Sequence, residues 1–158
     1  MFREIRRKRN EININDAKYL LNKERRGILA VNGDDGYPYA VPVNYLYSEE
    51  DNAIYFHGSK VGHKIDSIKK FDKVCFTVFG NEQIKEEAWA PYMQSVVIFG
   101  RCILIDNQDV AISILKKFAS KYYPNMELIE EEVSKSANAV QMFKINIEHI
   151  SAKQIKEK

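Results

Sequence analysis

The sequence predicts a mainly β protein, an antiparallel barrel with a few helices on its periphery. Apolar, β-branched and aromatic residues fall into five or six runs, and turn residues such as the Asn-Gly and Asp-Gly pairs of 32–36 separate them. Helical spacing of apolar residues occurs in only three places. Strands in hairpin order would leave exposed edges, which closure into a barrel removes. No repeat or Pro/Gly/Ser-rich linker divides the chain, so residues 1–158 are expected to form one domain.

The first half of the chain predicts one short helix over 15–24 and then three strands, at 27–32, 37–47 and 53–58. The middle strand is long and interrupted by prolines, and its residues alternate between two faces. One face carries Tyr37, Tyr39, Val41, Val43, Tyr45 and Tyr47, and the other carries Pro38, Ala40, Pro42, Asn44 and Leu46. A turn at 48–52 leads into the third strand.

The second half predicts two further helices and three further strands. The helices are expected at 62–71, with Ile65, Ile68 and Phe71 on one face, and at 107–124, with Val110, Ile114, Leu115 and Phe118 at helical spacing. The strands are expected at 73–80, 92–106 and 139–155. In the last of these, Val140, Met142, Ile145 and Ile147 alternate, with Phe143 out of phase.

Composition and charge limit the classes of partner. The net charge is only +2, and the basic residues of the extension 1–11 are not joined by a second basic stripe with interleaved aromatics, so we expect a solvated extension and no nucleic-acid partner. Cys75 and Cys102 lie in apolar runs, which favours buried free thiols in a reducing cytoplasm. No secretion signal or membrane-spanning stretch is visible, so a cytoplasmic protein without membrane contact is expected.

The stretch "IYFHGSKVGHKID" (54–66) is the strongest candidate for a binding site. It runs from a strand through a loop into a helix start, where free backbone N–H groups, the Ser59 hydroxyl and the side chains of Lys60, His63 and Lys64 could converge on an anion. The stretch matches no Walker or GxGxxG motif. A plain turn at Gly58 with solvated lysines is the alternative interpretation.

A second candidate lies in the strand 37–47. Pro42 lacks the N–H that a central strand needs, which indicates either an edge or bulge, or a flat ligand lying across the strand beside the Asn44 amide. His57 and His63 have no metal-ligand spacing with the cysteines, so no metal site is expected. No GxSxG motif and no cysteine with an evident base supports a hydrolase.

Together these stretches resemble the pyridoxamine 5'-phosphate oxidase-like flavin-binding split barrels, and within them the nitroimidazole-resistance (Nim) group. The similarity covers nearly the whole chain, in the order "GILAVNGDDGYPYAVPVNYLY", "IYFHGSKVGHKID", "KVCFTVFG" and "WAPYMQSVVIFGRCILID". It implies an antiparallel split β-barrel that is a homodimer, with FMN bound at the subunit interface. The Ser-Arg-Lys of the oxidase itself is replaced here by Gly62, His63 and Lys64, which is the Nim form.

The resemblance also implies which residues hold FMN. Pro42, Val43 and Asn44 correspond to the strand along the flavin ring, and Gln94 and Ser95, shortly after Trp89, correspond to positions that reach the cofactor from the second subunit. For the phosphate and ribityl end, the matching positions are His57, Gly58, Ser59, Gly62, His63 and Lys64. His57 is expected near the ring, where an imidazole of near-neutral pKa could donate a proton or orient a substrate as a catalytic residue.

The implied activity is that of an FMN-dependent oxidoreductase that reduces nitro-aromatic or other small electron acceptors. A non-catalytic protein that binds flavin or haem for storage or sensing is the alternative. Pyridoxamine 5'-phosphate oxidation is disfavoured, because the Ser-Arg pair is missing. No nicotinamide-binding motif is visible, so the sequence does not identify the electron donor.

Overall fold

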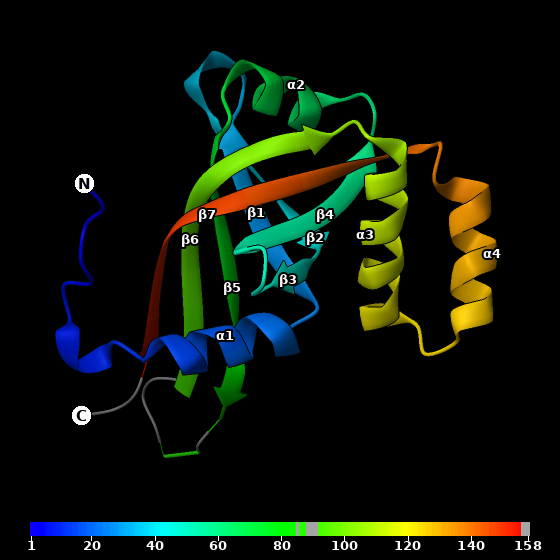
Figure 1. Cartoon of the computed structure of the whole chain (residues 1–158). Helices are drawn as coiled ribbons and strands as arrows, with labels where there is room; N and C mark the ends of the chain where they lie inside the picture. The colour runs from blue at the N-terminus through cyan, green and yellow to red at the C-terminus, as the bar shows by residue number, and fades with distance from the viewer. Residues whose placement is uncertain (85, 88–91, 156–158) are drawn as a thin grey trace.

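The computed structural model describes residues 1–84, 86–87 and 92–155. The described residues contain one antiparallel sheet and four α-helices (Figure 1). The strands are β1 (Arg26–Asn32), β2 (Pro38–Asn44), β3 (Leu46–Ser48), β4 (Ala53–Ser59), β5 (Lys73–Gln83), β6 (Tyr92–Ile105) and β7 (Val140–Ile155). The helices are α1 (Ile14–Lys23), α2 (His63–Lys70), α3 (Gln108–Tyr122) and α4 (Met126–Ser136), with 3-10 turns at Lys8–Asn10 and Asp34–Gly36.

The sheet is rolled into a split barrel. Its strand order is β2-β1-β5-β6-β7-β4-β3, and every pair is antiparallel. The two edge strands, β2 and β3, are consecutive in the chain and are joined by Tyr45 alone. Asn44 and Leu46 are two steps apart along the chain and so at most about 7 Å apart, which means that the two edges must lie close together and the sheet must curl. The predicted mainly β fold, an antiparallel split barrel with peripheral helices, is confirmed.

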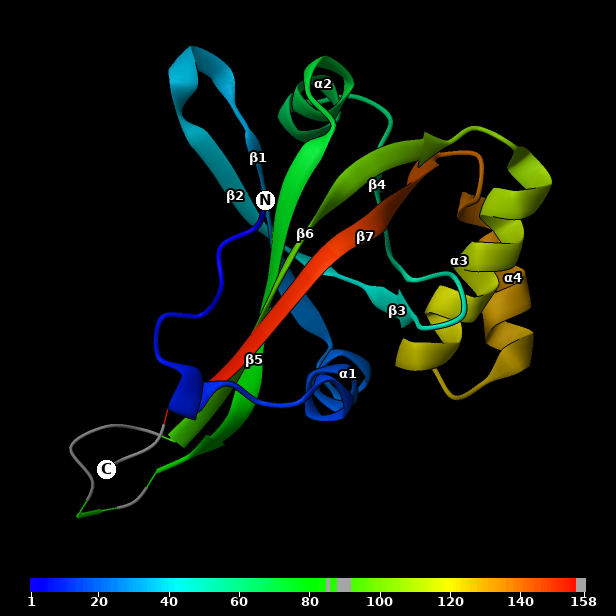
Figure 2. The ribbon, with the colours of Figure 1, turned by 60° about the vertical axis from the view of Figure 1, so that its left-hand side comes forward.

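The core fills the inside of this curl. Phe56 stacks on Phe143 with ring centroids 4.8 Å apart, and the Tyr45 ring meets Phe76 edge-on at 5.1 Å, all four being fully buried. Helix α1 packs across the lower part of the sheet in Figure 1 and buries Ala17, Leu20 and Leu21 completely. Helix α2 lies at the opposite end of the sheet (Figure 2).

Helices α3 and α4 cover the outer side of β4 and β7 and form a second, smaller core. Its buried residues are Leu115, Ile129, Val133 and Met142. Strand β7 is therefore buried on both faces, with Met142 against the helices and Phe143 in the barrel, which explains why two adjacent residues are apolar there.

Tyr122, near the end of α3, bridges the point where the barrel edges meet. Its hydroxyl accepts a hydrogen bond from the Tyr45 N–H at 2.8 Å and lies 2.6 Å from the carbonyl oxygens of Tyr45 and Arg25, to one of which it donates. The neighbouring Lys121 ammonium donates to the Glu24 carbonyl at 2.6 Å. One helix end thus satisfies the backbone groups that the turn at Tyr45 leaves without a sheet partner.

Several sequence expectations need correction. The expected strand 37–47 is two strands, because the chain leaves one sheet edge at Asn44 and joins the other at Leu46. Phe71 does not share the buried face of Ile65 and Ile68, because α2 ends at Lys70 and Phe71 has an extended backbone. Val110 is likewise exposed. Helix α4 was not expected from the sequence at all.

The N-terminal extension is mostly exposed, as expected, but it contacts the sheet at two places. The Phe2 ring stacks on Phe99 and on His149, with ring centroids 5.7 and 4.7 Å apart, and Asn10 donates to the Gln154 carbonyl at 2.8 Å. The extension therefore packs along β6 and β7. Cys102 is buried and Cys75 is half-buried, both as free thiols. Among the described residues, no helix is long and apolar enough to cross a membrane.

Candidate functional site

A pocket of about 280 Å³ lies between edge strand β2 and the loop that joins β4 to α2. It brings together six of the residues predicted to bind the cofactor: Pro42, Val43, Ser59, Gly62, His63 and Lys64. It also contains Tyr39, Val41, Val61 and Ile65, which the sequence analysis did not select. Tyr39 and Val41 lie on the same face of β2 as Val43, because side chains alternate along a strand. This alternation could have identified both residues from the sequence.

The N-terminus of α2 is open to a ligand. Gly62 is the N-cap residue, with φ 124° and ψ 172°, and no side chain caps the first turn. The Ser59 hydroxyl accepts a hydrogen bond from the Val61 N–H at 3.3 Å, so it holds the loop rather than the helix. Uncapped N–H groups and the positive end of the helix dipole favour an anion at this place.

Lys64 contributes a half-buried cation to the pocket. Its ammonium lies 5.5 and 5.7 Å from the ring centroids of Phe56 and Phe143. Among the described residues it makes no ion pair and no hydrogen bond, and burial lowers its pKa. Aromatic faces compensate only part of the lost hydration of an ammonium group. This cation is therefore suited to an anionic ligand.

Gly58 makes room for the Lys64 side chain. A β-carbon at Gly58 would lie 2.8 Å from the Lys64 Nζ and 3.2 Å from its Cε. Such distances are too short for ordinary contact, so any other residue at position 58 would displace the ammonium. The predicted importance of Gly58 thus has a physical basis in the position of Lys64.

The His63 side chain is engaged elsewhere. Its Nε2 accepts a hydrogen bond from the Asp34 N–H at 3.3 Å, and its ring stacks on Tyr39 with centroids 4.1 Å apart. These contacts fix the turn between β1 and β2 against the start of α2. His63 therefore offers its backbone N–H to the pocket, while its imidazole shapes the pocket wall.

His57 lies on the other face of β4. Its ring meets Phe118 of α3 edge-on at 4.9 Å and lines a separate cavity between the sheet and helices α3 and α4. Burial, and secondarily the Lys64 charge, lower the pKa of His57, and its buried Nδ1 makes no hydrogen bond with a described residue. The structure thus does not place His57 with the β2 pocket, and its predicted catalytic role stays a prediction.

The lowered pKa of His57 predicts a specific acid sensitivity. The unfolded chain binds a proton near pH 6.5, whereas the folded chain resists it, so stability should fall as the pH drops through 6.5. His57→Phe removes this contribution, and its free energy of unfolding should decrease less between pH 7 and pH 5 than that of the native chain. Urea unfolding at several pH values measures this decrease for the native chain and for the variant. Equal decreases would contradict the prediction.

The remaining predicted residues lie outside the β2 pocket within one chain. Asn44 is exposed at the end of β2. Pro42, which does line the pocket, is on an edge strand, as one interpretation of the sequence required. Gln94 accepts a hydrogen bond from Asn81 at 2.6 Å, and Ser95 lies beside it on β6. Trp89 lies outside the described residues. Within the described ranges, no group of three or more His, Cys, Asp or Glu side chains could hold a metal ion.

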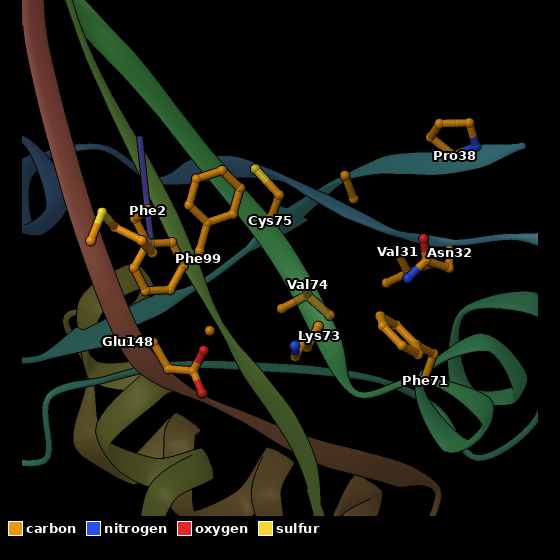
Figure 3. Close-up of a pocket in the computed structure, with 13 residues that line it drawn as sticks. Phe2, Val31, Asn32, Pro38, Phe71, Lys73, Val74, Cys75, Phe99 and Glu148 are labelled. Atoms are coloured by element: carbon orange, nitrogen blue, oxygen red, sulfur yellow. The ribbon is translucent and has the colours of Figure 1, made fainter. Parts of the chain in front are cut away.

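A third hollow, of about 470 Å³, lies on the outer face of β1, β5 and β6 (Figure 3). Phe99 and Phe71 are 39% and 47% exposed there, and Cys75 and Val74 lie between them along β5. The stacked Phe2 ring covers one side of this face. An apolar sheet face of this kind is typical of a surface that meets another protein.

A rolled antiparallel sheet, with an anion-receptive pocket between an edge strand and a strand-to-helix loop, defines a ligand-binding split barrel. The family model described as pyridoxamine 5'-phosphate oxidase matches residues 15–154. The chain belongs to this family, which confirms the resemblance recognised in the sequence. A comparison with curated proteins gives no match.

Solved structures with the same fold include flavin-binding proteins. A candidate 5-nitroimidazole antibiotic resistance protein from Bacteroides thetaiotaomicron is 16% identical, with TM-score 0.75 over 90% of this chain and 84% of that one. An FAD-binding protein from Mesorhizobium loti is 26% identical, with TM-score 0.62 over 92% and 96%. A flavocytochrome from Azotobacter vinelandii is 20% identical, with TM-score 0.75 over 98% and 77%.

Proposed function

We propose that this protein binds FMN and acts as an oxidoreductase that reduces nitro-aromatic or other small electron acceptors. The observation that carries the flavin assignment is the Lys64 ammonium, which is half-buried beside the uncapped start of α2 and has no anionic partner among the described residues. A phosphate dianion fits this combination of a cation and oriented N–H groups. The FAD-binding relative from Mesorhizobium loti supports a flavin ligand more generally.

Different residues of the site would hold different parts of FMN. Lys64 and the first N–H groups of α2 would bind the phosphate, while Pro42 and Val43 would offer an apolar edge to the ring. Asn44, which is exposed next to the pocket at the end of β2, would add a polar anchor. When bound, the flavin supplies the electron transfer itself, and the protein contributes position and electrostatics. The predicted proton donation or substrate orientation by His57 is tested by turnover of His57→Ala.

We also propose that the active form is a homodimer. The apolar outer face of the sheet, with Phe99 and Phe71 exposed, supports contact with a second copy. Gln94 and Ser95, which lie away from the β2 pocket of their own chain, would then reach the flavin of the other copy. Sedimentation at micromolar concentration measures the oligomeric state with and without FMN.

Anaerobic spectroscopy of the purified protein tests the proposed function. We expect a bound flavin spectrum that bleaches with NADH or NADPH and recovers on addition of a nitro-aromatic compound. Flavin that binds but is never reduced would instead support a storage or sensing protein, and a Soret band after haemin addition would support haem binding. A protein without affinity for FMN would contradict the proposal. FAD as a second titrant separates the two flavins.

Pyridoxamine 5'-phosphate is the matched control substrate. Because Gly62 and His63 replace the Ser-Arg of the oxidase, and the His63 ring is held by Asp34 and Tyr39, we expect no oxidation of this substrate. Hydrogen peroxide release from the FMN-loaded protein measures it.

A further inference from the structure

The cavity between the sheet and helices α3 and α4 is separate from the β2 pocket and has a defined chemistry. Its volume is about 570 Å³, within the range of small-molecule sites. Leu115 and Phe118 from α3, and Ile129 and Val133 from α4, form apolar walls. Tyr123 and Leu128 also line the cavity and are 64% and 60% exposed.

His57 is the polar residue that strand β4 contributes to this cavity. Its Nδ1 is buried and has no hydrogen-bond partner among residues 1–84, 86–87 and 92–155. A buried N–H without an acceptor is rarer than a buried lone pair without a donor, so the proton belongs on Nε2. Nε2 makes no hydrogen bond with a described residue, and His57 lines the cavity. The imidazole therefore offers one N–H donor to a cavity that has apolar walls and polar α4 residues, Glu131, Glu132, Lys135 and Ser136, in its lining.

The charges around the cavity favour a neutral occupant. Burial and the nearby Lys64 ammonium keep the imidazole uncharged and would repel a cation next to it. At the rim, Glu132 makes no ion pair with a described residue, and Glu131 is paired with Lys135, so an anion gains no attraction there. The edge-on contact of His57 with Phe118 leaves aromatic surface along the wall.

We propose that this cavity binds a neutral aromatic molecule carrying a hydrogen-bond acceptor, such as a ketone or quinone oxygen, which accepts from the His57 Nε2–H. The site lies on the opposite face of β4 from the β2 pocket and does not depend on the proposed function. Its occupant would lie between α3 and α4, with its acceptor directed at His57 and its rings against Phe118 and Val133.

A pair of matched probes tests the proposal with the flavin-free full chain. 2-Acetylnaphthalene carries the acceptor, and 2-ethylnaphthalene has nearly the same shape without it. We expect His57→Phe to weaken binding of the ketone by about 2- to 10-fold, the value of one hydrogen bond, and to leave the hydrocarbon unaffected. His149→Phe, on a distant face, is the control and should change neither.

Two further measurements locate the site. Ala119→Phe fills the cavity and should abolish binding of both probes. If this variant does not fold, ¹⁵N-histidine spectra of the native chain replace it, since the ketone should shift the His57 signal and not those of His63 and His149. The proposal is overturned if neither probe binds, if His57→Phe binds the ketone as tightly as the native chain, or if only another histidine shifts.

Discussion

Replacing Lys64 by methionine should weaken FMN binding by about 10- to 100-fold, the value of a hydrogen bond to a charged group. The same change should not lower the stability of the flavin-free protein. The ammonium is half-buried and has no anionic partner in the part of the chain that the structure describes, so the native chain keeps a charge in a place that disfavours it. Methionine would restore apolar contact with Phe56 and Phe143. FMN titration and urea unfolding measure the two effects.

Two variants serve as controls for this result. Lys60→Met removes an exposed lysine of the same loop and should leave FMN affinity nearly unchanged. Gly58→Ala keeps the Lys64 charge but pushes its ammonium aside, so it should weaken FMN binding less than Lys64→Met does. If Lys64→Met retains native affinity, or Lys60→Met loses as much, Lys64 does not hold the phosphate.

Replacing Tyr122 by phenylalanine should lower the free energy of unfolding by about 1–3 kcal/mol, because the buried Tyr45 N–H loses its acceptor. The ring remains, so its stacking on Phe118 at 5.0 Å and the Arg25 guanidinium 4.9 Å from its centroid are unaffected. Urea unfolding with an unchanged m-value would show a pure loss of stability.

Tyr123→Phe is the matched control for Tyr122→Phe. Tyr123 is adjacent in the chain and 64% exposed, and among the described residues its hydroxyl makes no hydrogen bond. We expect its removal to change stability by less than about 0.5 kcal/mol. Equal losses of stability in the two variants would mean that the hydrogen bonds of the Tyr122 hydroxyl contribute nothing specific.

Most strands could be predicted because their signals are local. Alternation and turn residues placed β1, β4, β5, β6 and β7, and the face shared by Val41, Val43, Tyr45 and Tyr47 is buried or half-buried throughout. Pairing is not local, so the sequence did not show that the chain changes sheet edge at Tyr45. Helix α4 was missed because its charged residues hide a stripe of only two buried residues, Ile129 and Val133.

The candidate site was predicted only in part, because some of its features follow from local sequence patterns and others depend on how distant segments pack. Pro42 and Lys64 meet in one pocket, which the order of motifs along the chain implied. The orientation of the His57 side chain could have been predicted. Phe56, the adjacent residue, is in the barrel core, and adjacent residues of a strand point to opposite faces. The contact of His63 with Asp34 depends on the packing of a hairpin turn against α2, which no local pattern encodes.

The junction at Tyr45 has a consequence for ligand affinity. Because a single residue connects the two sheet edges, β2 cannot swing away from β4 without breaking the buried contacts of Tyr45 with Phe76 and Tyr122. Val43 and the loop at Ser59 form two sides of the pocket, and the distance between them is therefore fixed before a ligand binds. A preorganised wall loses little conformational entropy on binding, so more of the interaction energy of the ligand appears as affinity.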